Sequence, residues 1–289
     1  MTPLPIVRSV PVLRVAIAAW RREGLTVGLV PTMGALHAGH LSLVTLIKSR
    51  CDRCVASLFV NPKQFAAHED LGRYPRDEAG DAALLAAAGC DLLFAPPTEV
   101  MYPDSFSTSI SVGGVSAPLE GEKRPQFFGG VATVVAKLLL QSLPDAAAFG
   151  KKDFQQLLVI RKLVADLDMP VEILAGETVR ETDGLAMSSR NAYLSAQERA
   201  VAGRLNVIMR EAVAAIEAGG AIAPALARAE ADIRTAGFTG IDYVALHDEA
   251  AFEPIGTDAL TSPARLLAAV QLGATRLIDN FPVTPDARA

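Results

Sequence analysis

An apolar run and two histidines share one short stretch of this sequence, Leu25-Thr26-Val27-Gly28-Leu29-Val30-Pro31-Thr32-Met33-Gly34-Ala35-Leu36-His37-Ala38-Gly39-His40. Residues 25–30, bounded by a glycine and a proline, predict a buried strand, and apolar side chains at helical spacing over residues 41–48 predict a helix. His37 and His40 therefore lie between a strand and a helix, where backbone N–H groups and the helix dipole favour an anion. Their imidazoles add donors for phosphate oxygens. The stretch predicts a nucleotide site.

Composition narrows the class of protein. The 289 residues are half apolar and one fifth charged, which is typical of a globular protein able to bury a substantial core. The net charge of −5 argues against a protein that wraps nucleic acid. No apolar run approaches the ~20 residues that span a bilayer, and the first residues lack the pattern of a signal peptide. We expect a cytoplasmic protein with no membrane partner.

The three cysteines are too few and too unevenly placed for a disulfide framework. One spacing suggests zinc ligands: two histidines, His37 and His40, are followed by two cysteines, Cys51 and Cys54. A predicted helix separates the two pairs, whereas structural zinc sites usually pair their ligands on a short turn. We therefore expect Cys54 to be a small core residue.

Short apolar runs alternate with helical patterns over the first two thirds of the chain. The expected strands are residues 27–30, 55–60, 92–94, 107–112, 146–149 and 171–174, and the expected helices are 41–50, 78–88, 131–140 and 154–167. The alternation predicts an α/β fold, a Rossmann-like, doubly wound parallel sheet with helices on its faces. Ligands bind such sheets beyond the carboxyl ends of the strands. Three polar motifs, at residues 31–40, 61–65 and 150–153, fall there.

A different pattern follows residue 190. Ser195 and Glu198 form a capping box, which opens a predicted helix to about residue 218, and a second helix is expected up to residue 237. Residues 241–246, 265–271 and 276–278 predict strands. This pattern indicates a smaller C-terminal α+β domain. We expect residues 1–184 to bind the ligands and residues 185–289 to form a lid.

Gly150-Lys151-Lys152-Asp153 joins a predicted strand to a helix. Asp153 can cap that helix, and Gln156 would complete a capping box. The two lysines would stabilise the negative charge of a polyphosphate; a solvated surface pair is the alternative.

Met187-Ser188-Ser189-Arg190 lies near the expected domain boundary. Two hydroxyls and a guanidinium suit phosphate oxygens, and at a hinge they could close over a nucleotide and exclude water.

Asn61 and Gln64 follow the strand expected to end at residue 60. Neutral amides suit the hydroxyls and carboxylate of a small polar substrate. The charged loop at residues 119–125 is either a cover for this site or a plain surface loop.

Together these motifs resemble one family. H-x-G-H near the start and M-S-S-R near two thirds of the chain are similar to the two motifs of the nucleotidyltransferase superfamily. The full order is P-T-M-G-A-L-H-x-G-H, F-V-N-P-x-Q-F, Y-P-R, L-E-G-x-x-R-P, G-V-A-T-V-V-A-K-L, F-G-x-K-D-x-Q-Q-L, V-R-E-x-D-G-L-A-M-S-S-R-N-x-Y-L and T-R-L-I-D-N. From about Gly28 to Asn280 it resembles the pantothenate synthetase family, the pantoate–β-alanine ligases.

The resemblance implies an enzyme that joins pantoate to β-alanine through a pantoyl adenylate, releasing AMP and pyrophosphate from ATP. It implies that His37, His40, Lys152 and Arg190 act in catalysis, with His40 as the acid. The implied ATP contacts are Met33, Gly34, Ala35, Leu36, His37, Ala38, Gly39, His40, Gly150, Lys151, Lys152, Asp153, Val179, Met187, Ser188, Ser189 and Arg190.

The resemblance also assigns the second substrate pocket and the metal. Gln64, Gln156 and Asn61 would hold pantoate, with Gln64 also near the amine of β-alanine. Mg²⁺ would bridge the phosphates, consistent with its preference for phosphate oxygens and few protein ligands. Asp81 is the one carboxylate that we connect with it.

Three positions depart from the family pattern. Phe127 stands where family members commonly carry histidine, and an aromatic hydrocarbon ring keeps packing but cannot donate. We expect the neighbouring amide of Gln126 to compensate. Gly80-Asp81 leaves one carboxylate where two are often found, and Lys63 replaces a smaller or apolar residue.

Two other functions remain open from the sequence. One is a nucleotidyltransferase that transfers the adenylyl group and stops, and the other is a sensor, suggested by Phe127 alone. A sensor has no transition state to stabilise. The chain nevertheless keeps the residues suited to that task, namely His40, Lys152, Ser188 and Arg190, which argues against a sensor. We expect small-molecule substrates, a homodimer and no nucleic-acid partner.

Overall fold

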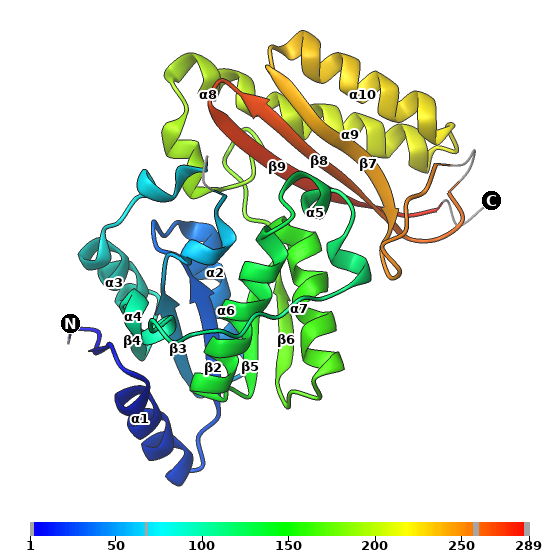
Figure 1. Cartoon of the computed structure of the whole chain (residues 1–289). Coiled ribbons are helices and arrows are strands. Elements are labelled where there is room, and N and C mark those ends of the chain that lie inside the picture. Colours follow the sequence, from blue (N-terminus) through cyan, green and yellow to red (C-terminus); the bar gives the residue numbers. More distant parts are fainter. Residues whose placement is uncertain (1–2, 67–68, 257–259, 286–289) are drawn as a thin grey trace. The chain divides into compact units, whose positions relative to one another are not determined.

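The computed structural model describes the chain apart from residues 1–2, 67–68, 257–259 and 286–289 (Figure 1). Two compact units make up the chain, Met1–Glu177 and Thr178–Ala289. The expected boundary after Gly184 falls inside the second unit. An ion pair between Arg180 and Asp279 ties the segment before Gly184 to the last strand of that unit.

The first unit contains a six-stranded parallel sheet in the order β1-β4-β3-β2-β5-β6 (Figure 1). Its strands are β1 (Ile6–Val7), β2 (Val27–Thr32), β3 (Arg53–Leu58), β4 (Leu92–Phe94), β5 (Ala146–Gly150) and β6 (Glu172–Gly176). The doubly wound parallel sheet expected from the sequence is confirmed. Strand β1 was not predicted, because two residues are too short to show a period.

One expected strand is wrong. Residues 107–112 form no strand; instead the backbone N–H of Ile110 donates to the Thr133 hydroxyl at 3.0 Å. The segment is thus held by a helix rather than by a neighbouring strand, although its apolar residues resemble those of a strand.

Helices cover both faces of this sheet. They are α1 (Val10–Arg22), α2 (Ala38–Lys48), α3 (Glu78–Ala87), α4 (Thr98–Met101), α5 (Glu120–Lys123), α6 (Phe127–Ser142) and α7 (Phe154–Asp166), with short 3-10 turns η1 (Pro62–Gln64), η2 (Asp70–Gly72), η3 (Gly114–Ser116) and η4 (Lys151–Asp153). Leu29 packs in the core with α1, α6 and α7, whereas the next residue, Val30, packs with α2 and α3. Successive strand residues point to opposite faces, so one strand supplies both cores.

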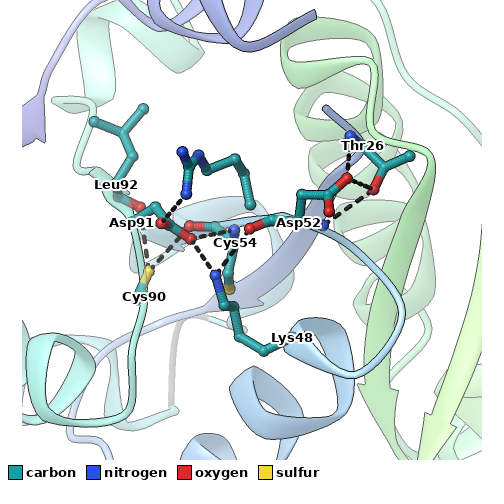
Figure 2. A network of polar contacts seen from close by, with 8 residues as sticks. Thr26, Lys48, Asp52, Cys54, Cys90, Asp91 and Leu92 are labelled. Carbon is teal, nitrogen blue, oxygen red and sulfur yellow. Dashed lines mark hydrogen bonds and ion pairs between the residues drawn. The ribbon is translucent and has the colours of Figure 1, made fainter. Parts of the chain in front are cut away.

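Polar contacts join the amino ends of three neighbouring strands (Figure 2). Asp91, just before β4, accepts from the Cys54 backbone N–H at 2.7 Å and pairs with Lys48 at 2.9 Å. Asp52, just before β3, accepts from the Thr26 backbone N–H at 2.9 Å. Because these strands run parallel, their carboxyl ends lie at the opposite edge of the sheet, where the polar motifs follow them.

The three cysteines are free thiols in the interior of the first unit. Cys51, Cys54 and Cys90 are unbridged and buried, and the described residues contain no group of three or more His, Cys, Asp or Glu suited to a metal ion. A hydrogen bond with Cys90, reinforced by burial, raises the pKa of the Cys54 thiol. The expectation that Cys54 is a core residue is confirmed.

The second unit is an antiparallel sheet, β7-β8-β9, packed against helices. Its elements are η5 (Ser189–Tyr193), α8 (Ala196–Ala202), α9 (Arg204–Glu217), α10 (Ile222–Ala236), β7 (Gly240–Asp248), β8 (Ala264–Leu272) and β9 (Thr275–Val283). The expected α+β character is confirmed. Within the described parts of both units, no helix is long and apolar enough to cross a bilayer.

The expected long helix from residue 196 to about 218 is instead two helices. The Ser195–Glu198 capping box that opens α8 is confirmed, with the Glu198 N–H 3.2 Å from Ser195 Oγ. Helix α8 ends at Ala202, and its C-cap is Gly203, where an added Cβ would lie 2.5 Å from a carboxylate oxygen of Asp183. The loop bearing Asp183 therefore comes close to the chain at the break, a contact that the alanine-rich sequence does not reveal.

Candidate active site

The loop between β2 and α2 has a strained backbone held by one carboxylate. Gly34 has φ +89° and Ala35 has φ +52°, a region that costs an alanine energy. Asp81 of α3 is 4% exposed and accepts from the N–H groups of Ala35 at 3.0 Å and Leu36 at 2.8 Å. A Cβ at Gly34 would lie 2.9 Å from Asp81 Oδ2. Asp81 thus anchors the loop that leads into the two histidines.

The two histidines cap helix α2. His37 is the N-cap, and its Nδ1 accepts from the Gly39 N–H at 3.2 Å, while His40 Nδ1 accepts from the His37 N–H at 3.3 Å. A backbone N–H can only donate, so each Nδ1 is unprotonated and each neutral ring carries its hydrogen on Nε2. The ring centroids are 4.1 Å apart. The site therefore contains a pair of Nε2–H donors at a helix N-terminus.

His40 is neutral at physiological pH. Burial is the main cause that lowers its pKa to about 3, and repulsion from a protonated His37 and from the Lys152 ammonium acts in the same direction. A neutral imidazole donates a hydrogen bond but does not supply an imidazolium proton. The influence of Lys152 also shows that the lysine motif lies near the histidines, as expected for the adjacent strands β2 and β5.

The lysine motif forms the 3-10 turn η4 rather than a capped helix start. Asp153 is the N-cap of α7, but its side chain makes no capping hydrogen bond, so the predicted capping box with Gln156 is wrong. Lys152 Nζ lies 3.9 Å from Asp153 Oδ2, and Lys151 pairs with Glu177. The 3-10 turn gives Asp153 φ −97° and ψ 59°, unlike the extended Ser195, where capping does occur.

Asn61 is the N-cap of η1 and lies buried beside Gln64, the last residue of that turn. Asn61 Nδ2 donates to Gln64 Oε1 at 3.0 Å, and Gln64 Nε2 lies 3.1 Å from Met33 Sδ. The Tyr102 hydroxyl donates to Asn61 Oδ1 at 2.8 Å. Tyr102 follows α4 and was missed from the sequence, because no local pattern links it to residue 61. Gln156 of α7 is partly exposed.

The remaining predicted nucleotide contacts lie in the second unit, where the structure groups them with one another. The Met187 N–H donates to the Val179 carbonyl at 3.0 Å. Ser188 Oγ accepts from the Arg190 N–H at 3.3 Å and so begins the turn η5. Val179 and the M-S-S-R motif therefore belong to one hairpin, although Val179 lies eight positions before Met187 in the sequence.

That hairpin is held by ion pairs. Arg180 contacts both carboxylate oxygens of Asp279 in β9, at 2.7 and 2.9 Å. Arg199 pairs with Glu181 at 2.6 Å, and Asn191 Nδ2 donates to the same glutamate at 2.8 Å. The V-R-E and T-R-L-I-D-N motifs thus meet through Arg180 and Asp279.

Comparison with known proteins identifies the family. The profile described as pantoate-beta-alanine ligase matches residues 5–282. The chain belongs to the pantoate-beta-alanine ligase family. A pantothenate synthetase from Rhodospirillum rubrum is 56% identical over 283 residues, 98% of this chain and 100% of that protein. One from Rhizorhabdus wittichii is 57% identical over 282 residues, covering 98% and 99%.

Solved structures agree with this assignment. A crystal structure of the pantothenate synthetase from Thermus thermophilus has a TM-score of 0.91 and 46% identity, covering 98% of this chain and 100% of that one. A pantoate-beta-alanine ligase from Francisella tularensis, complexed with beta-gamma ATP and beta-alanine, has a TM-score of 0.81 and 32% identity, covering 96% and 97%. The family inferred from motif order is confirmed, and the chain is an enzyme.

Within this family, Phe127 has a packing role in the chain. Its ring is 9% exposed, and the Arg124 guanidinium lies 3.8 Å from the ring centroid. Arg124 also contacts both carboxylate oxygens of Glu69, at 2.7 and 2.6 Å. Gln126 is exposed at the N-cap of α6. Its side chain and that of Phe127 lie in different surroundings, which argues against the compensation expected from sequence.

The loop at residues 119–125 is packed against its unit. Glu120 is buried, and its backbone N–H donates to Gln155 Oε1 at 3.2 Å. Gln155 Nε2 donates in turn to the Pro118 carbonyl at 2.7 Å. Lys63, another departure, lies 5.1 Å from the Tyr102 ring centroid and 5.2 Å from that of Phe106. Its ammonium thus takes part in cation–π contacts.

Proposed function

We propose that the enzyme condenses pantoate with β-alanine in two steps through a pantoyl adenylate. The observation that carries the proposal is the pair of neutral histidines, held by Asp81 at the N-terminus of α2 and close to Lys152. Nε2–H donors, helix N–H groups and an ammonium together suit a developing negative charge on phosphate oxygens. These are the groups that adenylation requires.

In the first step, a carboxylate oxygen of pantoate attacks the α-phosphorus of ATP, and the bond to pyrophosphate breaks. His37 and His40 donate to phosphate oxygens, and Lys152 stabilises the charge that accumulates on them. His40 acts as a neutral donor in this scheme rather than as the cationic acid implied by resemblance, because its pKa is near 3 in the free enzyme.

In the second step, the amine of β-alanine attacks the pantoyl carbonyl carbon. A C–N bond forms, the bond to AMP breaks, and the amine loses a proton to solvent. Gln64 and Gln156 hold pantoate in the proposal, and the support for Gln64 is its buried amide cluster with Asn61. Val179 and Met187–Arg190 contact the nucleotide in the proposal, and their support is their grouping on one hairpin.

Mg²⁺ enters the proposal bound to the phosphates of ATP. Mg²⁺ bound there would supply positive charge against the phosphate oxygens. Both carboxylate oxygens of Asp81 accept from the loop N–H groups, and the described residues hold no cluster of acidic side chains suited to a metal. These contacts favour an ion held by phosphate oxygens and water, with Asp81 serving the loop.

We also propose a cytoplasmic homodimer. Three buried, unbridged cysteines fit a reducing compartment. Exposed apolar side chains on the adjacent helices α1 and α6, among them Val12, Val15 and Leu140, suit a contact with a second copy. Light scattering of the purified protein measures the oligomeric state.

The test is an assay with ATP, Mg²⁺, D-pantoate and β-alanine in which AMP is measured. Without β-alanine, the enzyme should still exchange labelled pyrophosphate into ATP, because adenylation is reversible and needs no amine. AMP release that begins only with β-alanine, with no exchange, would contradict the adenylate.

A further inference from the structure

The side chain of Asn61 uses all of its hydrogen-bonding capacity inside the protein. Its Nδ2 donates to the Gly130 carbonyl at 3.1 Å and to Gln64 Oε1 at 3.0 Å. Its Oδ1 accepts from the Tyr102 hydroxyl at 2.8 Å and from the Lys63 N–H at 3.3 Å. The residue is 1% exposed. Asn61 therefore has no donor or acceptor left to offer a substrate.

Two backbone groups set the direction of the Asn61 amide. The Gly130 carbonyl can only accept and the Lys63 N–H can only donate, so exchanging the amide nitrogen and oxygen would break both contacts. Helix α6 can approach so closely because Gly130 lacks a side chain; a Cβ there would lie 2.4 Å from the Lys63 carbonyl oxygen.

The direction of the Asn61 amide sets that of Gln64. Asn61 presents N–H, so the Gln64 atom facing it is the acceptor Oε1. The Gln64 NH₂ group is thereby turned to Met33, whose sulfur at 3.1 Å is a weak acceptor. A substrate oxygen is a stronger partner for this NH₂ group than the thioether.

Tyr102 supports the arrangement from outside the motif. Burial raises the pKa of its phenol, so the hydroxyl stays protonated and donates to Asn61. The ring packs with Phe59 and Phe106, with centroid separations of 5.9 and 5.1 Å. Removing the hydroxyl would leave Asn61 Oδ1 with the longer contact to Lys63 alone.

We propose that Tyr102 and Asn61 are positioning residues that turn the NH₂ group of Gln64 to pantoate, so that the pocket selects an oxygen acceptor on the substrate. The inference rests on the proposed role of Gln64 in holding pantoate and adds the direction of its amide. A carboxylate or hydroxyl oxygen of pantoate is the group recognised. Neither positioning residue touches the substrate.

Comparing Gln64→Glu with Gln64→Ala tests the direction of the amide. Glutamate would still accept from Asn61 but would present a second oxygen to the carboxylate of pantoate. We expect both variants to raise the KM for pantoate about tenfold or more, with Gln64→Glu at least as impaired as Gln64→Ala, and to leave the KM for ATP unchanged. If Gln64→Glu retains wild-type affinity, Gln64 presents its oxygen and the proposal is wrong.

Tyr102→Phe tests the positioning residue, with Tyr243→Phe, a hydroxyl deletion in β7 of the second unit, as the matched control. We expect a rise of about three- to tenfold in the KM for pantoate from Tyr102→Phe and no change from the control. In a Gln64→Ala background, Tyr102→Phe should add nothing, because its effect passes through the deleted amide.

The outcomes separate the two proposals. A Gln64→Ala variant with an unchanged KM for pantoate would overturn the proposed role of Gln64 itself. If Gln64→Ala raises the KM for pantoate but Tyr102→Phe behaves like its control, only the positioning role is wrong. The same holds if Tyr102→Phe raises the KM for pantoate further in the Gln64→Ala background. Thermal melting identifies any variant that fails to fold, and if Tyr102→Phe is one, the Gln64→Glu comparison still decides the amide direction.

Discussion

The carboxylate of Asp81 accepts a 2.8 Å hydrogen bond from the backbone N–H of Leu36, which connects helix α3 to the loop before His37. Its other oxygen accepts from Ala35, whose φ is +52°. A strained loop persists only where its surroundings determine it. The position of the histidine pair therefore depends on a side chain more than forty residues away along the chain.

Asp81→Asn should destabilise this loop. An asparagine would turn an NH₂ group toward one of the two backbone N–H donors, leaving a buried group unpaired at a cost of about 1–3 kcal/mol in the free energy of unfolding. Pyrophosphate exchange should fall with it. Asp77→Asn is the control, because Asp77 caps α3 by accepting from the Gly80 N–H and asparagine caps equally well. If Asp81→Asn leaves the stability unchanged and only raises the Mg²⁺ concentration that the reaction requires, Asp81 is a metal ligand instead.

Removing either proposed phosphate donor should slow adenylation. We expect His40→Ala and Lys152→Ala to lower the rate of pyrophosphate exchange by about 10²–10³, the range for a lost donor to developing charge. Both side chains are only partly buried, so circular dichroism should show an intact fold. Near-normal exchange in both variants would remove them from the mechanism.

His40 should also make the stability of the protein depend on pH. Its folded pKa of about 3 lies below the ordinary value of 6.5, so between these values the unfolded chain binds a proton that the folded chain does not. The contribution is fully present above about pH 6.5 and is lost as the pH falls toward 3. From about pH 7 to pH 5, wild type should lose about 2 kcal/mol more than His40→Gln in urea unfolding. If wild type and His40→Gln lose equal stability between these pH values, the pKa of His40 is not depressed in the folded protein.

Phe127 should prove to be a packing residue. Phe127→His keeps an aromatic ring under Arg124, so AMP formation should change by less than about tenfold, whereas Phe127→Ala should cost about 3–5 kcal/mol of stability. Gln126→Ala should have no effect, because the side chain is exposed. A gain of about a hundredfold in Phe127→His would show that the family histidine has a chemical role that this chain has lost.

The ion pair between Arg180 and Asp279 should be essential to the hairpin that carries Met187–Arg190. Their side chains are 17% and 3% exposed, and removing one partner of such a buried pair typically costs about 3–5 kcal/mol. Asp279→Asn should therefore lower the melting temperature and weaken ATP binding. Asp242→Asn, which breaks the more exposed pair with Arg276, should cost about 1 kcal/mol or less. Equal effects would argue against a special role for Asp279.

The sequence by itself determined those features whose causes are local. The apolar runs at residues 27–30 and 146–149 became β2 and β5, because their period and flanking turn residues lie within a few positions of one another. The Ser195–Glu198 capping box was predictable for the same reason. The order of long motifs was enough to identify the family, and the strand pattern predicted H-x-G-H and G-K-K-D at the same edge of one sheet.

Only the tertiary structure decided what depends on contacts between distant segments. Residues 107–112 have the composition of a strand but bind a helix through Ile110 and Thr133, and the helix expected through Gly203 is interrupted beside Asp183. The ring hydrogens of His37 and His40, the direction of the Gln64 amide and the partners of Asp81 follow from hydrogen bonds and burial created by folding. Such properties arise from the groups that surround a side chain, and those groups are assembled only when segments far apart in the chain pack together.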